Sequence, residues 1–131
     1  MNRILVVCFS LILTASPLQA RPARTTGLAS WYGESHRGRF MANGARFNPD
    51  KLTAASWFYP LGTKVQVTVE AQDRTGAPVT RSVMVTITDR GPALDLVRAG
   101  RIIDLGAAAF KKLAHPDVGL IQVRVNQVSK S

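Results

Sequence analysis

The sequence has a single cysteine, two histidines and no long apolar run after its first twenty residues. Cys8 lies within those twenty residues, so a domain that begins after them has no cysteine and no disulfide. His36 and His115 stand far apart, without a cluster at metal-ligand spacing. No later segment approaches the roughly 20 apolar residues that a membrane helix needs. We therefore expect a domain that packing alone stabilises, with no metal, no cofactor and no stable membrane insertion.

Acidic residues are also scarce: 8 Asp and Glu stand against 17 Lys and Arg, which gives a formal net charge of +9. A protein this basic is expected to meet a polyanion. Nucleic acid is not favoured, because no basic stripe is interleaved with stacking aromatics. The sequence also contains no Gly-rich phosphate cradle and no nucleophilic triad. The cell-wall polymer, with its peptide carboxylates, remains a candidate partner.

Residues 1–20 have the form of a secretory signal peptide. Arg3 supplies a short positive start, an apolar run follows, and Ala20 offers a small residue for cleavage. The protein is therefore predicted to be periplasmic or secreted. A lipid anchor at Cys8 is not favoured, because Val7 occupies a place where a small residue is wanted and only seven residues precede the thiol.

The remaining chain consists of short apolar runs separated by turn residues, as in a small β-barrel. Residues 21–26 are expected to be a disordered lead-in, and residues 27–128 to form one domain. Strands are predicted at 28–32, 52–55, 64–69, 82–88, 101–105 and 120–128, with a long loop at 33–50, a hairpin loop at 70–81 and a helix at 106–115. The pattern predicts a mainly β domain of about six strands with one short helix.

Asp89 ends the clearest of these strands. Alternate residues from 83 to 87 are Val or Ile, so one face of the strand is buried, and Asp89 continues that parity. The Gly-Pro pair after Arg90 stops regular pairing, which places the carboxylate where the inner face opens to solvent. A partly shielded carboxyl there is suited to acid or base chemistry. The alternative is a structural aspartate held by Arg90 or by turn amides.

Two further acids are candidates. Asp104 follows a second apolar run, although it could instead cap the helix that begins at Gly106. Glu34 lies in the long loop, near enough in sequence to fold back over the mouth of the barrel. Its alternative is a solvated loop charge paired with Arg37 or Arg39.

The aromatic residues suggest a sugar-binding surface. Trp31 and Tyr32 are consecutive in a strand, so one is expected to pack inward while the other faces outward, where a ring can stack on a sugar. Trp57, Phe58 and Tyr59 cannot all be buried by a single strand, so at least one is expected to be exposed along a groove. The alternative is that these three rings cover the open end of a small barrel.

Several segments together resemble the rare lipoprotein A family. They are Gly27-Leu28-Ala29-Ser30-Trp31-Tyr32-Gly33, Ala42-Asn43-Gly44 with Arg46-Phe47-Asn48, Leu52-Thr53-Ala54-Ala55, Pro60-Leu61-Gly62-Thr63-Lys64-Val65, Asp89-Arg90-Gly91-Pro92 and Gly100-Arg101-Ile102-Ile103-Asp104-Leu105. They run in family order through most of the expected domain. The resemblance implies a six-stranded double-psi β-barrel, a fold shared with the expansins and with some lytic transglycosylases.

This resemblance also implies an activity, the endolytic cleavage of peptidoglycan glycan strands to leave 1,6-anhydro ends. An acid protonates the bridging oxygen, and the same or a second group takes the proton of the sugar's own C6 hydroxyl, so no water is consumed. We expect a monomer in which Asp89 is the main acid and base, with Glu34 as the second catalytic candidate. The expected substrate-binding residues are Trp31, Tyr32, Arg90, Asp104 and Trp57.

Two positions depart from the family pattern. Ala45 stands where the family motif carries a glutamate regarded as catalytic, and Ser56 stands where a histidine is usual. These departures favour a second interpretation, a module of the same fold that grips glycan without cutting it. A third is an envelope scaffold whose basic surface recruits partners, because fold alone does not decide function.

Overall fold

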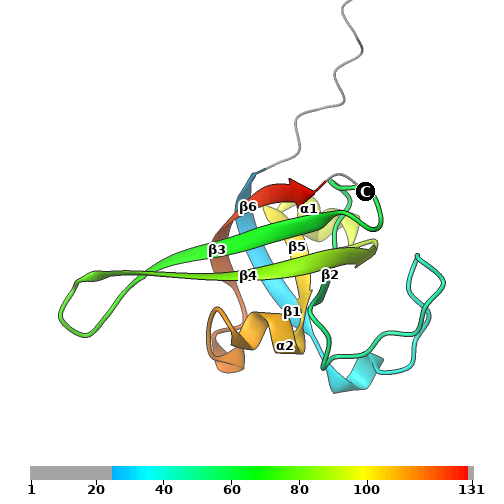
Figure 1. Cartoon of the computed structure of the whole chain (residues 1–131), viewed down its shortest axis with the longest axis horizontal. Coiled ribbons are helices and arrows are strands. Elements are labelled where there is room, and N and C mark those ends of the chain that lie inside the picture. Colours follow the sequence, from blue (N-terminus) through cyan, green and yellow to red (C-terminus); the bar gives the residue numbers. More distant parts are fainter. Residues whose placement is uncertain (1–24, 130–131) are drawn as a thin grey trace, which may run out of the picture.

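The computed structural model describes residues 25–129, and the remaining residues at each end lie outside the description. The predicted signal peptide with Cys8 and Ala20, and most of the predicted lead-in, lie outside it. Six strands and four short helices make up the described part (Figure 1). The strands are β1 (Thr26–Tyr32), β2 (Thr53–Ala55), β3 (Lys64–Gln72), β4 (Pro78–Asp89), β5 (Arg101–Gly106) and β6 (Ile121–Ser129). The helices are α1 (Leu94–Arg98) and α2 (Ala107–Lys111), with the 3₁₀ turns η1 (Glu34–His36) and η2 (Pro116–Val118).

The strands close into a barrel in the order β1-β5-β2-β4-β3-β6. Two neighbouring pairs, β1 with β5 and β2 with β4, are parallel, and the other pairs are antiparallel. This closed six-stranded barrel confirms the predicted mainly β fold of the double-psi type. None of the helices between residues 25 and 129 is long and apolar enough to span a membrane.

The core follows the alternation read from the sequence. Val65 and Val67 of β3 lie opposite Val85 and Val83 of β4, Ile87 follows at the next alternate position of β4, and all five are buried. Burying one such side chain contributes about 1.5–3 kcal/mol, so these facing rows are a main source of stability. Below them α2 closes one end of the barrel (Figure 1).

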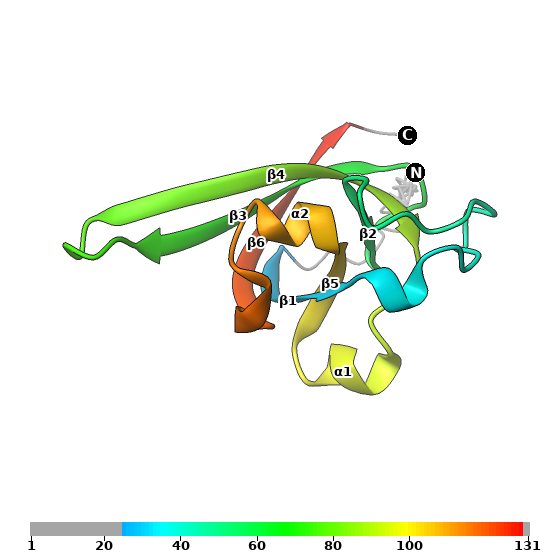
Figure 2. The ribbon, with the colours of Figure 1, turned by 90° about the horizontal axis from the view of Figure 1, so that it is seen from below.

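The hairpin loop predicted at 70–81 is wrong, because most of that segment is strand. β3 and β4 stay paired as far as Gln72 and Pro78, and they project well beyond the barrel (Figures 1 and 2). The turn is closed by the Asp73 carboxylate, which accepts the backbone N–H groups of Thr75 and Ala77 at 2.8 and 3.0 Å. Nearly all residues of this arm are exposed, so no apolar alternation marks it in the sequence.

The helices also differ from the prediction. α2 lies inside the predicted helical segment 106–115 but has five residues, and a second five-residue helix, α1, was not predicted. Leu96 and Val97 of α1 are half-buried. Five residues make too few turns for a helical period to be visible in a sequence. The predicted long loop contains η1, which places His36 close to the end of β1.

Candidate functional site

Two aspartates meet on either side of the short strand β2. Ala55 pairs with Asp89 of β4 on one side and with Asp104 of β5 on the other. Neighbouring strands lie about 4.8 Å apart, so the two acid-bearing backbones are about 10 Å apart before their side chains extend. A Cβ at Gly91 would lie 3.3 Å from the Ala55 Cβ and 3.4 Å from Asp104 Oδ2, so Gly91 lies close over Ala55 and Asp104. Both aspartates and Ala55 line a pocket of about 210 Å³, together with Tyr32, His36, Arg90, Gly91, Pro92 and Ala93.

A register shift brings Asp89 to this pocket. Ala54 lies opposite Ile87, but the next residue, Ala55, lies opposite Asp89, so Thr88 is an extra residue in β4. Such a bulge changes the side of the sheet to which the following side chains point. The prediction that Asp89 continues the buried parity of its strand is therefore wrong, although β4 does end at this residue. The side chain is half-buried beside Ala55 and Asp104 instead.

The two oxygens of Asp89 have different surroundings. Oδ1 accepts the backbone N–H groups of Ala42 and Arg90 at 2.9 and 2.8 Å. Oδ2 receives no hydrogen bond from residues 25–129, and within that range no cation forms an ion pair with the carboxylate. Turn amides thus hold Asp89, as the structural alternative supposed, but through one oxygen. The other oxygen is available to a ligand in the pocket.

Asp104 is half-buried and contacts the neighbouring strand β1. Ser30 lies opposite it in the β1–β5 ladder and donates its hydroxyl hydrogen to Oδ1. Burial raises the pKa of Asp104 above its ordinary value, against smaller opposite effects of the Ser30 hydrogen bond and of the charges on Arg101 and His36. α2 begins at Ala107, after the N-cap Gly106, and the Asp104 carboxylate accepts a hydrogen bond from Ser30 and none from the amides of α2, so the capping role considered for Asp104 is wrong.

The raised pKa predicts a pH-dependent stability. Between the unfolded pKa of about 4 and the higher folded value, the native Asp104 keeps a proton that the unfolded chain has lost. Its contribution to stability is therefore fully present below the unfolded pKa and is lost as the pH rises through the folded pKa. We expect Asp104→Asn to gain stability relative to the wild type as the pH rises from about 4 to 7. Urea denaturation of both proteins across this range measures it, and a pH-independent difference would contradict it.

Tyr32 presents a hydroxyl group that lacks a partner. This buried oxygen has no hydrogen bond within residues 25–129. Burial, and then the negative charges of Asp89 and Asp104, raise the pKa of Tyr32. The hydroxyl therefore stays protonated, and it is a buried donor without a partner in the wall of the aspartate pocket.

His36 also lines the pocket. From the sequence this lone loop histidine is a possible proton carrier, although such a residue is more often a bystander. The His36 ring meets the Tyr32 ring edge-on, with centroids 5.7 Å apart. The contact arises because η1 folds the chain back after β1. A three-residue turn in a loop has no period, so the sequence could not predict this contact between the two rings.

Arg90 forms part of the pocket wall and holds a neighbouring turn. Its Nη1 donates to the backbone oxygens of Ser56 and Tyr59 at 2.7 and 2.6 Å. The guanidinium forms no ion pair with Asp89, so the alternative in which the Arg90 side chain holds Asp89 is wrong. The guanidinium thus orients the pocket wall through backbone carbonyls.

Losing this guanidinium should destabilise the protein. We expect Arg90→Met to lower the free energy of unfolding by about 1.5–3 kcal/mol, because two carbonyls lose a charged donor. Urea denaturation measures the change. Arg98→Met, at an exposed position of α1, is the matched control. Equal stability of the two variants would contradict the assigned role.

Trp57 lies next to this pocket. The residue is 47% exposed, and its Nε1 donates to the backbone oxygen of Pro92 at 2.6 Å. Phe58 is half-buried against the core and Tyr59 is buried. The prediction that at least one ring of this run is exposed is confirmed. Trp57 is thus held at a fixed angle beside a pocket residue.

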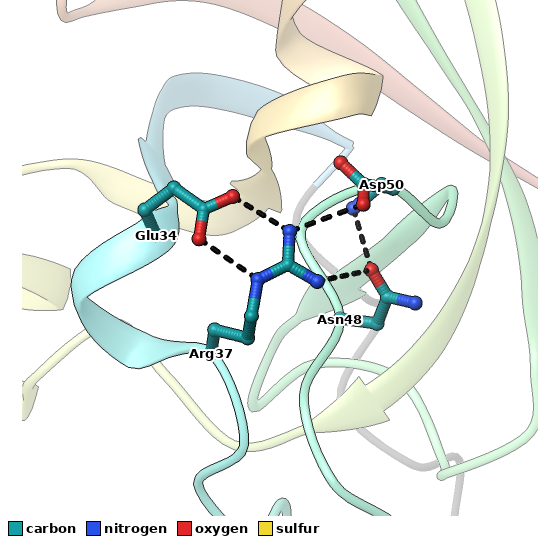
Figure 3. A network of polar contacts seen from close by, with 4 residues as sticks. All are labelled: Glu34, Arg37, Asn48 and Asp50. Atoms are coloured by element: carbon teal, nitrogen blue, oxygen red, sulfur yellow. Dashed lines mark hydrogen bonds and ion pairs between the residues drawn. The ribbon is translucent and has the colours of Figure 1, made fainter.

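Trp31 and Glu34 lie outside the pocket of the two aspartates. Trp31 lines a separate hollow, and Glu34 borders the same hollow. Arg37 binds both oxygens of Glu34, at 2.8 and 2.6 Å, and contacts Asp50 Oδ2 at 3.1 Å (Figure 3). The hydrogen bond from Arg37 is the largest influence on Glu34 and lowers its pKa. The structure thus matches the ion-pair alternative and does not bring Glu34 to Asp89.

The two departures from the family pattern have different positions. Ser56 is fully buried, where its hydroxyl donates to the Ile102 oxygen and accepts the Phe58 N–H, both at 3.1 Å. Ala45 is exposed in the loop whose Ala42 N–H holds Asp89. Neither position supplies an acid or a base. Within the described part of the chain, no three His, Cys, Asp or Glu side chains are placed to hold a metal ion.

The closed barrel and the pocket with two aspartates place the protein among small double-psi β-barrel domains. Comparison with family models agrees with this class. The chain belongs to the family described as lytic transglycolase, whose model matches residues 24–125.

Curated relatives carry related names. The chain is 43% identical over 102 residues to the probable endolytic peptidoglycan transglycosylase RlpA of Synechocystis, covering 78% of this chain and 28% of that protein. It is 37% identical over 109 residues to the endolytic peptidoglycan transglycosylase RlpA of Pseudomonas aeruginosa, covering 83% of this chain and 29% of that protein. The chain thus spans less than a third of the length of these relatives.

Two solved structures share the fold. The Streptomyces papain inhibitor matches with a TM-score of 0.56 at 24% identity, over 82% of this chain and 98% of that one. An expansin of Clavibacter michiganensis, solved as a mutant in complex with cellohexaose, matches with a TM-score of 0.53 at 19% identity, over 80% of this chain and 50% of that one. Identities this low support the shared barrel and nothing more specific.

Proposed function

We propose that the protein is an endolytic lytic transglycosylase that cleaves peptidoglycan glycan strands in the cell envelope. The observation that carries the proposal is the pairing of Ala55 with both Asp89 and Asp104, which gives one pocket two carboxyl groups in different surroundings. Pairs of acids whose environments differ can divide acid and base roles. Relatives named as peptidoglycan transglycosylases support the choice of substrate.

Asp104 is the proposed proton donor. Burial raises its pKa, so it retains a proton at a higher pH than an ordinary aspartate. In the proposed reaction Asp104 protonates the bridging oxygen as the bond from that oxygen to the sugar's C1 breaks. The free Oδ2 of Asp89 takes the proton of the C6 hydroxyl as O6 bonds to C1. This 1,6-anhydro closure uses no water, and the two proton transfers balance.

Other residues of the pocket would bind the sugar. Tyr32 lines the pocket with its hydroxyl buried, so this residue would form part of the wall against the sugar. The exposed Trp57 ring, fixed by its bond to Pro92, can stack on a sugar face. Arg90 has its Nη1 engaged by two carbonyls, so we assign it a positioning role in place of direct substrate binding.

A glycan-binding module of the same fold is the second candidate. Ala45 and Ser56 favour it, because they replace two polar groups of the family pattern. In that case the pocket holds sugar, but no bond breaks. The two candidates differ in whether product forms.

The deciding experiment incubates the purified protein with sacculi stripped of stem peptides and seeks 1,6-anhydro products by mass spectrometry. Asp89→Asn is the matched variant, since it keeps an oxygen for the Ala42 and Arg90 amides. Products that disappear in this variant support the enzyme. Protein that pellets with sacculi without any product supports the binding module and rejects the enzyme.

A further inference from the structure

The loop between β1 and β2 contains a small antiparallel tongue, residues 38–47. The Gly38 N–H donates to the Phe47 oxygen at 2.9 Å, and Phe40 forms an isolated antiparallel bridge with Arg46. The tongue stands out from the barrel in two perpendicular views (Figures 1 and 2). Backbone pairing therefore gives this part of the loop a defined shape.

The tip of the tongue is bonded to the end of β4. The Ala42 N–H donates to Asp89 Oδ1 at 2.9 Å, and the next amide, that of Asn43, donates to the Thr88 oxygen at 3.2 Å. The Thr88 hydroxyl also donates to the Met41 sulfur at 3.3 Å. The tongue is therefore in direct contact with one of the two acids of the pocket.

The base of the tongue is attached as well. Arg37, which directly precedes it, binds Glu34 and Asp50 (Figure 3). The Phe47 ring packs against the Tyr32 ring with centroids 4.3 Å apart, and Tyr32 lines the aspartate pocket. Because both its tip and its base are bonded, the tongue has a fixed position beside that pocket.

The tongue displays an exposed aromatic ring, that of Phe40. The residue is 69% exposed, more than any other large apolar residue in the range 25–129. The Arg46 guanidinium lies over the ring at 4.3 Å from its centroid and donates through Nη1 to the Gly38 oxygen at 2.9 Å. One face of the ring is thus covered by a held guanidinium, and the other is open. A ring that is already held in place binds a ligand with little loss of conformational freedom.

The position of Phe40 suits a polymer that is bound in the aspartate pocket. Only Met41 lies between Phe40 and Ala42, whose N–H holds Asp89. Each residue of an extended chain adds about 3.3 Å, so the backbones of Phe40 and Ala42 are about 7 Å apart. A sugar next to the one in the pocket can therefore reach the ring.

The charge of the tongue also suits a glycan strand. Neither Arg39 nor Arg46 forms an ion pair within residues 25–129. A muramic acid that has lost its stem peptide carries a free lactyl carboxylate, which free guanidinium groups attract. A stripped strand therefore offers both sugar faces for the ring and carboxylates for the arginines.

We propose that the tongue is a further subsite for the glycan strand, in which the open face of Phe40 stacks on a sugar next to the one in the aspartate pocket. Arg39 and Arg46 attract the carboxylates of the same strand. This inference rests on the proposed function, but it applies equally to a cleaving enzyme and to a glycan-binding module. The tongue contributes to binding and takes no part in the proton transfers.

Binding of soluble glycan strands stripped of stem peptides tests the proposal. The Asp89→Asn variant serves as the parent protein, so that no strand is cleaved. Adding Phe40→Ala is expected to raise the Kd about three- to tenfold, as for the loss of one aromatic contact. Adding Phe40→Tyr, which keeps a ring, should leave the Kd near that of the parent.

Val118→Ala is the matched control, an apolar truncation at a residue of η2 that is 59% exposed. It should not change the Kd. An unchanged Kd in Phe40→Ala, or an equal rise in Phe40→Tyr and Phe40→Ala, would overturn the proposal. Since these values are measured without cleavage, a missing anhydro product bears on the proposed enzyme alone.

Removing one cation provides a second measurement. Arg46→Gln takes away the group that holds the ring, so the Kd is expected to rise at least about threefold. Arg74→Gln makes the same change in charge at an exposed residue between β3 and β4 and should have little effect. Equal weakening by both variants would mean binding through general surface charge, which rejects the subsite.

Vesicles of anionic phospholipid test the other ligand that an exposed Phe beside arginines could bind. We expect no binding that depends on Phe40, because one ring buries too little apolar surface for a stable membrane anchor. If Phe40→Ala abolished vesicle binding and left the affinity for glycan unchanged, the tongue would be a membrane contact and the proposal would be rejected.

Discussion

Replacing Asp104 with asparagine is expected to slow the release of 1,6-anhydro products by about 10²–10⁴-fold, the usual contribution of a general acid. Asparagine has nearly the same shape and keeps an oxygen that can accept the Ser30 hydroxyl hydrogen. What it loses is the proton that burial helps Asp104 to retain. Product release is measured by mass spectrometry on stripped sacculi, at equal protein concentration.

The control for this variant is Asp95→Asn, the same chemical change at an exposed position of α1. It should leave the rate unchanged. Asp104→Asn should also unfold at no lower urea concentration than the wild type at pH 7, so lost activity is not lost folding. Full activity in Asp104→Asn would show that Asp104 does not donate the proton and would return the acid role to Asp89.

Truncating Phe110 to alanine is expected to lower the free energy of unfolding by about 3–5 kcal/mol, the usual loss for a buried Phe. The side chain is fully buried in the core and supports the Trp31 ring from α2. The free energy of unfolding of a native protein is about 5–15 kcal/mol in total, so the variant should be only marginally folded. Urea denaturation followed by tryptophan fluorescence measures the loss.

Leu94→Ala removes a comparable apolar side chain from α1, where Leu94 is 59% exposed. Substitutions at such sites usually change stability by no more than about 0.5 kcal/mol. A similar loss in both variants would mean that α2 does not seal the barrel end as described.

The strands that form the core could be predicted from the sequence because they alternate buried and exposed residues. Val65, Val67, Val83 and Val85 mark two of them directly. The arm from Glu70 to Arg81 could not be predicted, since strands that are exposed to solvent on both faces carry no such alternation. Asp89 and Asp104 were also predicted as candidate acids from their positions at the ends of apolar runs, and the structure brings both to one pocket.

The geometry of the site depended on features that have no sequence signature. An extra residue at Thr88 moves Asp89 to another side of the sheet, and strand periodicity alone predicts the opposite. Asp104 and Asp89 meet because β2, from an earlier segment of the chain, lies between the strands that carry them. Glu34 was near enough in the chain to be a candidate, but Arg37 is nearer and binds it. Contacts between distant segments decided each case.

The three-residue strand β2 has a consequence for how this barrel can change. Since Ala55 is bonded to the backbones of both acid-bearing strands, the spacing of the carboxyl groups is set by sheet hydrogen bonds. The β3–β4 arm can therefore be lengthened, shortened or exchanged while the spacing of the two acid-bearing strands stays constant, whereas the loop at 33–50 must keep the Ala42 N–H that holds Asp89. New polymer specificities could be engineered onto this scaffold by grafting loops, with the pair of acids kept as an unaltered module.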